Sequence, residues 1–126
     1  MMTYLWVAMG GAVGASGRFF VTSMTTRFMG HGFPWGTMVV NIVGSFVMGA
    51  LISFMAIKWS TTNEVRALLT TGVLGGFTTF SAFSLDFATL FERKAYLATF
   101  GYTVGTVGLS LLAVFAGLIA VRTVLS

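Results

Sequence analysis

The 126-residue sequence contains no cysteine, which excludes disulfide bonds, thiolate chemistry and cysteine-ligated metal sites. Charge is also scarce: Asp, Glu, Lys and Arg make up 8% of the chain, against about 25% in an ordinary soluble domain. A water-soluble globule of this size would lack the charge to cover its surface. With 56% hydrophobic residues and a mean hydropathy of +0.93, the composition predicts an integral membrane protein.

The few charges that are present argue against nucleic-acid binding and against most enzymes. Seven Lys and Arg residues stand against three Asp and Glu residues, and they are scattered along the chain. A nucleic-acid interface needs many basic groups on one face. At 13.5 kDa the chain has room for one domain of about four spanning helices, but not for a separate catalytic domain.

Apolar runs between the charged residues predict an all-α membrane protein with four transmembrane helices in a single domain, 1–126. The expected ranges are 4–24, 37–57, 67–90 and 96–121. Pro34 precedes the second helix, and the polar segment 59–66 is expected to form a loop. A cleaved signal peptide is the alternative for the first range, but this segment lacks the basic n-region of a signal peptide.

The distribution of basic residues gives almost no orientation signal. Four spans place both chain ends on one side of the membrane, so the charges can be counted by side. The terminal side has Lys58, Arg66 and Arg122. The other side has Arg27, Arg93 and Lys94, with Arg18 inside the first span. Either a feature outside the charge count sets the orientation, or the protein inserts both ways and pairs with an inverted copy of itself.

Glycine is abundant, and most of the 16 glycines fall inside the predicted helices. Gly10 and Gly14, like Gly101 and Gly105, have the four-residue spacing that lets two helix backbones approach closely. Glycines spaced in this way are typical of helix packing surfaces, and they do not by themselves indicate transport.

The third predicted helix has an unfavourable sequence in its middle. Gly72, Gly75 and Gly76 occur there, within a segment, 72–84, that also holds four serine and threonine residues. Glycine costs about 1 kcal/mol relative to alanine inside a helix. We therefore expect the helix to break, which would free backbone groups at mid-membrane depth for a cavity or an ion. A glycine-rich kink packed against a neighbouring helix is the alternative.

Uncharged polar and aromatic side chains recur at helical spacing within the spans. Phe80 and Phe83 are three residues apart, and the positive edges of their rings would suit a small anion, although this spacing is also typical of core packing. Hydroxyl and amide groups also share helix faces: Thr37 with Asn41, and Tyr102 with Thr106 and Ser110. Neutral donors are expected where ionised groups are costly. Arg18 either snorkels to the interface or gives a vestibule a positive potential.

Three segments carry a family resemblance. Residues 14–18, 36–41 and 75–84 read GASGR, GTMVVN and GGFTTFSAFS. With the four spans and the polar stripe of the fourth helix, they resemble the Fluc (CrcB) family of bacterial fluoride channels over essentially the whole chain. The resemblance implies a fluoride-selective channel in the bacterial plasma membrane that exports fluoride passively. It also implies an antiparallel homodimer in the lipid bilayer, with two pores lined by both subunits.

Roles for individual residues come from the same resemblance. The implied pore residues are Asn41, Phe80, Phe83, Thr37, Ser81, Ser84, Tyr102, Thr106 and Ser110, with Arg18 in the vestibule. The backbone carbonyls of Gly75 and Thr78 match the family's structural Na⁺ site at the dimer interface. Ala82 departs from the family pattern, which usually has threonine at that position.

Two alternative functions stay open. A small proton-coupled multidrug exporter also has four spans, but it needs a carboxylate in the first helix, where this sequence has Arg18 and no Asp or Glu. A non-transporting assembly subunit would account for the glycines, but not for Asn41 and the polar stripes.

Overall fold

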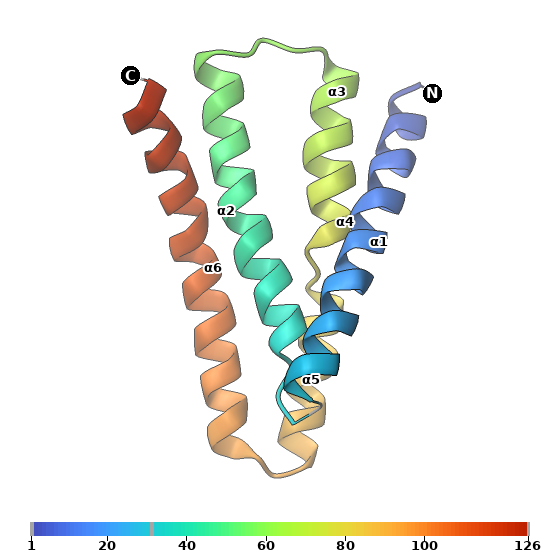
Figure 1. Ribbon diagram of the computed structural model, residues 1–126, viewed down its shortest axis with the longest axis vertical. Coiled ribbons are helices and arrows are strands. Elements are labelled where there is room, and N and C mark those ends of the chain that lie inside the picture. The colour runs from blue at the N-terminus through green and yellow to red at the C-terminus, as the bar shows by residue number, and fades with distance from the viewer. Residues whose placement is uncertain (1, 31, 126) are drawn as a thin grey trace.

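The computed structural model describes residues 2–30 and 32–125, which form four long helical stretches lying side by side (Figure 1). Three of them are the uninterrupted helices α1 (Met2–Met29), α2 (Trp35–Ile57) and α6 (Tyr96–Leu125). The remaining stretch comprises α3 (Asn63–Ala67), the π-helix η1 (Leu68–Leu74), α4 (Gly75–Phe77) and α5 (Ser81–Glu92). The described residues contain no strand, so the prediction of an all-helical protein is confirmed.

The first and last helices are longer than predicted. α1 continues beyond residue 24 to Met29, because nothing interrupts it until Gly30. Gly30 takes a left-handed conformation with φ 83°, and its N–H donates to the carbonyl of Thr26 over 2.8 Å, which ends the helix. α6 continues to Leu125, since no glycine follows Gly117 and the only proline of the chain is Pro34.

The expected loop 59–66 is wrong over its second half. α3 begins at Asn63, and the hydroxyl of Thr62 caps it by accepting a hydrogen bond of 3.3 Å from the N–H of Val65. Glu64 lies in the first turn, where a negative charge stabilises the helix dipole. The polarity of this segment therefore reflects a helix start rather than a loop.

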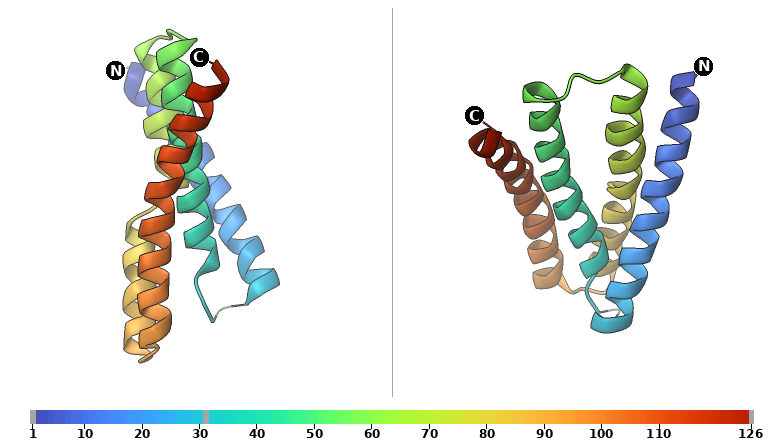
Figure 2. Two further views of the ribbon diagram at one scale, coloured as in Figure 1. Left: turned by 90° about the vertical axis from the view of Figure 1, so that its left-hand side faces the viewer. Right: turned by 45° about the horizontal axis from the view of Figure 1, so that its top comes forward.

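The helices pack as two pairs. α2 runs along α6, and α1 runs along η1 and α4, while α5 lies beside α6. The two pairs diverge toward the end of the bundle that holds both chain ends and the α2–α3 connection (Figure 1). The α1–α2 and α5–α6 connections lie at the opposite end, as Figure 2 also shows.

Glycines make both helix pairs possible. A Cβ at Gly14 would overlap the carbonyl oxygen of Val73, and one at Gly117 would lie 2.7 Å from the backbone nitrogen of Ala50. The packing role expected for the Gly10 and Gly14 pair is confirmed, because a Cβ at Gly10 would overlap the carbonyl oxygen of Leu68. In the second predicted pair, a Cβ at Gly101 would meet no neighbouring helix within 4 Å, whereas one at Gly105 would lie 3.0 Å from Cε of Met38 on α2.

Three helical stretches are long and apolar enough to cross a membrane, namely 35–57, 63–92 and 96–125. α1 has 28 residues and lies alongside them, but its glycines, Ser16 and Arg18 make it less apolar. Most large hydrophobic side chains are exposed, and the buried cluster is small: Met38, Phe83, Leu90 and Tyr102. An apolar exterior around a small interior is the arrangement that a lipid-embedded helical protein requires.

Candidate functional site

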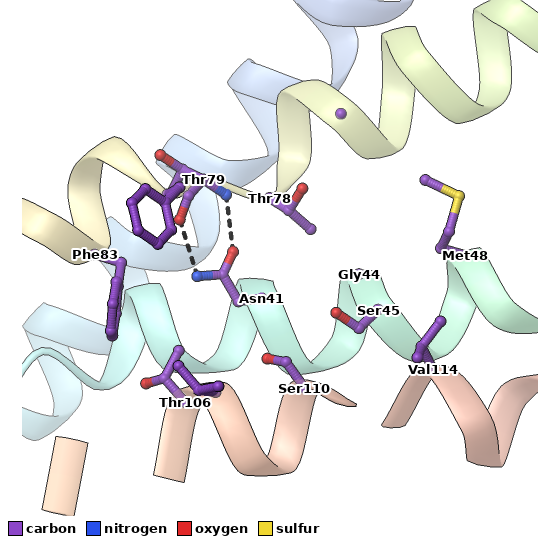
Figure 3. Close-up of a pocket in the computed structure, with 13 residues that line it drawn as sticks. Asn41, Gly44, Ser45, Met48, Thr78, Thr79, Phe83, Thr106, Ser110 and Val114 are labelled. Atoms are coloured by element: carbon purple, nitrogen blue, oxygen red, sulfur yellow. Dashed lines mark hydrogen bonds between the residues drawn. The ribbon is translucent and has the colours of Figure 1, made fainter. Parts of the chain in front are cut away.

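A groove of about 460 Å³ lies between α2, α6 and the segment that joins α4 to α5. Figure 3 shows its lining side chains approaching from these three directions. The lining residues are Asn41, Gly44, Ser45, Met48, Gly75, Thr78, Thr79, Phe80, Phe83, Thr106, Val107, Ser110 and Val114. None of these described lining residues carries a formal charge. The groove therefore offers hydrogen-bonding groups and aromatic rings without an ionised side chain.

Asn41 holds the connection between α4 and α5. Thr78 is extended, with φ −89° and ψ 160°, and residues 78–80 belong to neither helix. The Nδ2 of Asn41 donates to the carbonyl of Thr79 over 3.0 Å, and the N–H of Thr79 donates to Oδ1 of Asn41 over 2.8 Å (Figure 3). One amide side chain thus pairs with both backbone groups of Thr79, while the second hydrogen of Nδ2 is still available to another acceptor.

Two backbone carbonyls lose the partners they would have in a continuous helix. In an α-helix, Thr79 N–H would donate to the carbonyl of Gly75, and Ala82 N–H would donate to that of Thr78. Here Thr79 N–H donates to Asn41, and Ala82 N–H donates to the hydroxyl of Thr79 over 3.2 Å. Gly75 and Thr78 are the two residues expected to hold Na⁺, and both line the groove. Carbonyl oxygens relieved of their helical donors fit the hard, oxygen-preferring character of such a cation.

Arg18 contacts the backbone near the break in the third helical stretch. Its Nε donates to the carbonyl of Gly76 over 3.2 Å, so the side chain reaches from α1 to the end of α4. A cation at the last carbonyls of a helix is favourably placed in the helix dipole. Arg18 therefore stabilises the end of α4, and it is not among the residues that line the groove.

Thr106 and Ser110 provide the clearest sign of a polar ligand. Their hydroxyl oxygens are buried, and neither has a hydrogen-bond partner among the described residues. Other hydroxyls of the same helix bond back to it: Thr103 donates to the carbonyl of Thr99 over 2.9 Å. Buried polar groups nearly always have a hydrogen-bond partner. Two buried hydroxyls that line a groove without one therefore indicate a partner from outside the chain, such as water or an ion.

Phe80 and Phe83 both line the groove but differ in burial. Phe80 is 76% exposed, whereas Phe83 is 8% exposed and packs in the core cluster. Their ring centroids are 5.6 Å apart, and the Phe83 ring lies 5.2 Å from that of Tyr102. Packing within one chain accounts for Phe83, but it gives no reason for a large exposed ring at Phe80.

Thr37 and Tyr102 lie outside the groove, together with Asp86. The hydroxyl of Thr37 donates to Oδ2 of Asp86 over 2.7 Å, and the hydroxyl of Tyr102 donates to the same oxygen over 3.1 Å. These two expected pore residues are therefore brought together, but on a carboxylate rather than along the groove. Ser81 and Ser84 are exposed and do not line the groove either, and the hydroxyl of Ser81 lies 3.2 Å from that of Thr79.

Comparison with known proteins identifies the family. Residues 5–118 match the family described as "CrcB-like protein, Camphor Resistance (CrcB)". The chain belongs to this CrcB family. A relative from Rhizobium leguminosarum bv. trifolii is 52% identical over 122 residues, which cover 97% of this chain and 98% of the relative. It is named "Fluoride-specific ion channel FluC".

Other CrcB relatives carry the same name at similar identity. One from Chelativorans sp. strain BNC1 is 49% identical over 125 residues, covering 99% of this chain and all of the relative. One from Caulobacter vibrioides is 47% identical over 125 residues, covering 98% of each chain. These relatives are named as ion channels and not as enzymes. With its apolar helices, this CrcB protein is a multi-pass bacterial membrane protein.

Asp86 is the shared partner of Thr37 and Tyr102, and the sequence interpretation gave it no role. The available signal was its type, because it is the one acidic residue inside any of the four predicted spans. An ionisable residue within a span is costly and marks a functional site by default. Its partners, Thr37 and Tyr102, stand out by their own helical spacing, whereas the carboxylate that joins them does not.

Proposed function

We propose that this chain conducts fluoride selectively and passively across the bacterial plasma membrane, exporting it from the cytoplasm. The observation that carries the proposal is the pair of unpaired buried hydroxyls, Thr106 and Ser110, in a groove without charged lining residues. Fluoride is small and strongly hydrated, so a pore must replace the hydrogen bonds of water. Hydroxyl, amide and ring-edge donors can do so, while a lysine or arginine side chain beside the permeating ion would hold it too tightly for fast release.

The family adds independent support, because relatives matched over 98% and 100% of their length are named fluoride-specific ion channels. The alternative function, a small proton-coupled multidrug exporter, gains no support. It needs a carboxylate in the first helix, and the first acidic residue of this sequence is Glu64.

Fluoride efflux from liposomes tests the function directly. Vesicles loaded with fluoride and containing the purified protein are expected to release it rapidly, as measured with a fluoride electrode, and to retain chloride in a parallel experiment. The double variant Thr106→Val, Ser110→Ala should lose about tenfold or more in rate, since two buried donors disappear with little change in volume. Thr103→Val is the control, because the hydroxyl of Thr103 is bonded to its own helix. Absence of fluoride release by the unmodified protein would support the assembly-subunit alternative.

We further propose that the functional unit is an antiparallel homodimer with two pores. Within one chain the groove is open, and polar or aromatic groups near it are exposed, namely Phe80, Ser81 and Ser84. In a monomer these groups would face lipid at the depth of the α4–α5 connection. A second copy would cover them and complete the donor set, and the balanced basic residues permit insertion in both orientations.

Orientation is the measurable consequence of this pairing. A tag on the C-terminus should be accessible from both faces of the membrane in comparable amounts. Adding three lysines to the segment 58–62 should bias the orientation and lower the efflux of the biased protein. Co-expression with a copy biased by lysines in the α5–α6 connection should restore it. Labelling that finds every C-terminus on one face would contradict the antiparallel dimer.

We also propose a structural Na⁺ at the dimer interface, held by the carbonyl oxygens of Gly75 and Thr78 of both subunits. The support is the diversion of their helical donors to Asn41 and to the hydroxyl of Thr79. Prolonged dialysis into Na⁺-free buffer containing a bulky organic cation should lower dimer retention in detergent, and return of Na⁺ should restore it. Dimer retention that stays constant through complete Na⁺ removal would argue against the site.

A further inference from the structure

The stripe of hydroxyl groups on α6 ends inside the groove. Thr106 and Ser110 are four residues apart, and the next position at this spacing is Val114, which also lines the groove. Met48 lines the same end of the groove from α2, and Figure 3 shows Met48 and Val114 there, away from Thr106. An ion that passes Ser110 therefore meets two apolar side chains, which cannot replace the hydrogen bonds of water.

Ser45 is the one hydroxyl residue that α2 contributes to the described groove lining. It follows Asn41 by four residues and so lies on the same helix face. The threonine hydroxyls of the groove's α4–α5 side are used within the chain. That of Thr78 donates to the carbonyl of Leu74 over 3.0 Å, and that of Thr79 accepts a backbone N–H over 3.2 Å. The hydroxyl of Ser45 makes no hydrogen bond to another described residue, so it is available to a partner in the groove.

The register of α2 against α6 places Ser45 at the level where the stripe ends. Both helices run from the α1–α2 and α5–α6 connections toward the end that holds the chain termini (Figure 1). A Cβ at Gly49 would overlap the carbonyl oxygen of Val114 and lie 3.0 Å from the nitrogen of Leu118. One turn earlier on both helices, Ser45 lies between the levels of Ser110 and Val114, as Figure 3 also shows.

We propose that the hydroxyl of Ser45 contacts the permeating fluoride at this end of the groove, where α6 offers the apolar Val114 instead of a donor. The inference rests on the proposed function, because it names the donor that follows Ser110 along the groove. A hydroxyl on α2 thus takes the place that the spacing of α6 would give to residue 114. Because Met48 and Val114 donate no hydrogen bond, the loss of the Ser45 hydroxyl leaves the ion less solvated at this level than anywhere else in the groove.

Removal of the hydroxyl gives the first test. Ser45→Ala is expected to lower fluoride efflux from liposomes about three- to tenfold, the range that the loss of one hydrogen bond gives, while thermal unfolding and dimer retention in detergent stay unchanged. Ser53→Ala is the matched control, since it makes the same change farther along α2 and outside the groove lining. The hydroxyl of Ser53 donates to the carbonyl of Leu118 over 3.0 Å, so Ser53→Ala should lower stability and retain efflux.

Return of a hydroxyl from the other helix gives the second test. Val114→Thr added to Ser45→Ala should restore efflux to within about twofold of the unmodified protein, because a donor of nearly the same shape as valine then stands at the same level. Val107→Thr is the control for this exchange. Val107 also lines the groove from α6, but it is the residue after Thr106, away from Ser45, and the added hydroxyl should restore nothing.

Three results would overturn the contact between Ser45 and fluoride. They are equal efflux by Ser45→Ala and the unmodified protein, equal rescue by Val114→Thr and Val107→Thr, and a loss of dimer retention in Ser45→Ala that matches its loss of efflux. The last result would assign Ser45 to packing between subunits. Val114→Thr alone leaves Ser45 in place and should raise efflux, and a lower rate would contradict the need for a donor at this level. If the unmodified protein releases no fluoride, the proposed function itself fails.

Discussion

Replacing Asn41 with aspartate is expected to abolish fluoride efflux. The carboxylate can still accept the N–H of Thr79, but it loses the donor that pairs with the carbonyl of Thr79 at 3.0 Å. A negatively charged oxygen then faces a carbonyl oxygen, and an uncompensated partner of this kind costs about 1–3 kcal/mol. The same charge stands in the groove and repels the permeating anion. The lost hydrogen bond and the repulsion of the anion therefore both lower the rate of fluoride efflux. We expect a loss of about a hundredfold or more in that rate.

Matched variants separate the two causes. Asn41→Ala removes both hydrogen bonds to Thr79 without adding a charge, so it should retain more flux than Asn41→Asp. Asn63→Asp makes the same chemical change at the only other asparagine, at the exposed start of α3, and is expected to conduct normally. Thermal unfolding in detergent checks that each variant is folded. Asn41→Asp with half the normal flux or more would contradict the role assigned to this amide.

Hydropathy and composition predict the number and type of the helices, because both depend on local sequence. Capping is harder to foresee: the start of α3 depends on the hydroxyl of Thr62, in a segment whose polarity also suits a loop. Asn41 lies on a helix whose own backbone cannot satisfy its amide, so a partner elsewhere is foreseeable. Which partner it finds depends on tertiary packing, because Thr79 lies 38 residues later in the chain.

Helical periodicity fails where the rotation of one helix against another decides the contact. Tyr102, Thr106 and Ser110 recur every four residues, and this spacing predicts one polar stripe. Thr106 and Ser110 do line the groove, but the hydroxyl of Tyr102 reaches Asp86 on the neighbouring α5. Arg18 is similar, because its partner is a backbone carbonyl that is exposed only where α4 ends. A single sequence carries no direct signal for either pairing.

The spacing of Phe80 and Phe83 illustrates the same limit. It predicts both on one face of a resumed helix, but α5 begins at Ser81, so Phe80 precedes it. The two rings share the groove and differ widely in exposure, at 76% and 8%. From the sequence alone, the ring-edge and packing interpretations apply equally to both residues. Because the exposure of the two rings differs, the structure leads to a different expectation for each residue.

Phe80→Ile is expected to lower fluoride efflux about tenfold or more with little change in stability. The side chain keeps most of its apolar volume and is largely exposed within one chain, so folding loses little, while a ring edge that would solvate the anion is removed. Phe83→Ile should lower flux and also cost about 1–2 kcal/mol, because Phe83 packs in the core cluster against Tyr102.

The control is Phe87→Ile, which makes the same replacement on α5 at a ring stacked on Phe91 and outside the groove. It should leave efflux unchanged. Efflux, dimer retention and thermal unfolding are measured on all three variants. A ring-edge role requires that Phe80→Ile lowers flux but not stability, and that Phe83→Ile lowers both. Near-normal flux through the Phe80→Ile, Phe83→Ile double variant would show that both rings act as packing alone, because no aromatic edge would then remain between Asn41 and Tyr102 to replace the hydration of the ion.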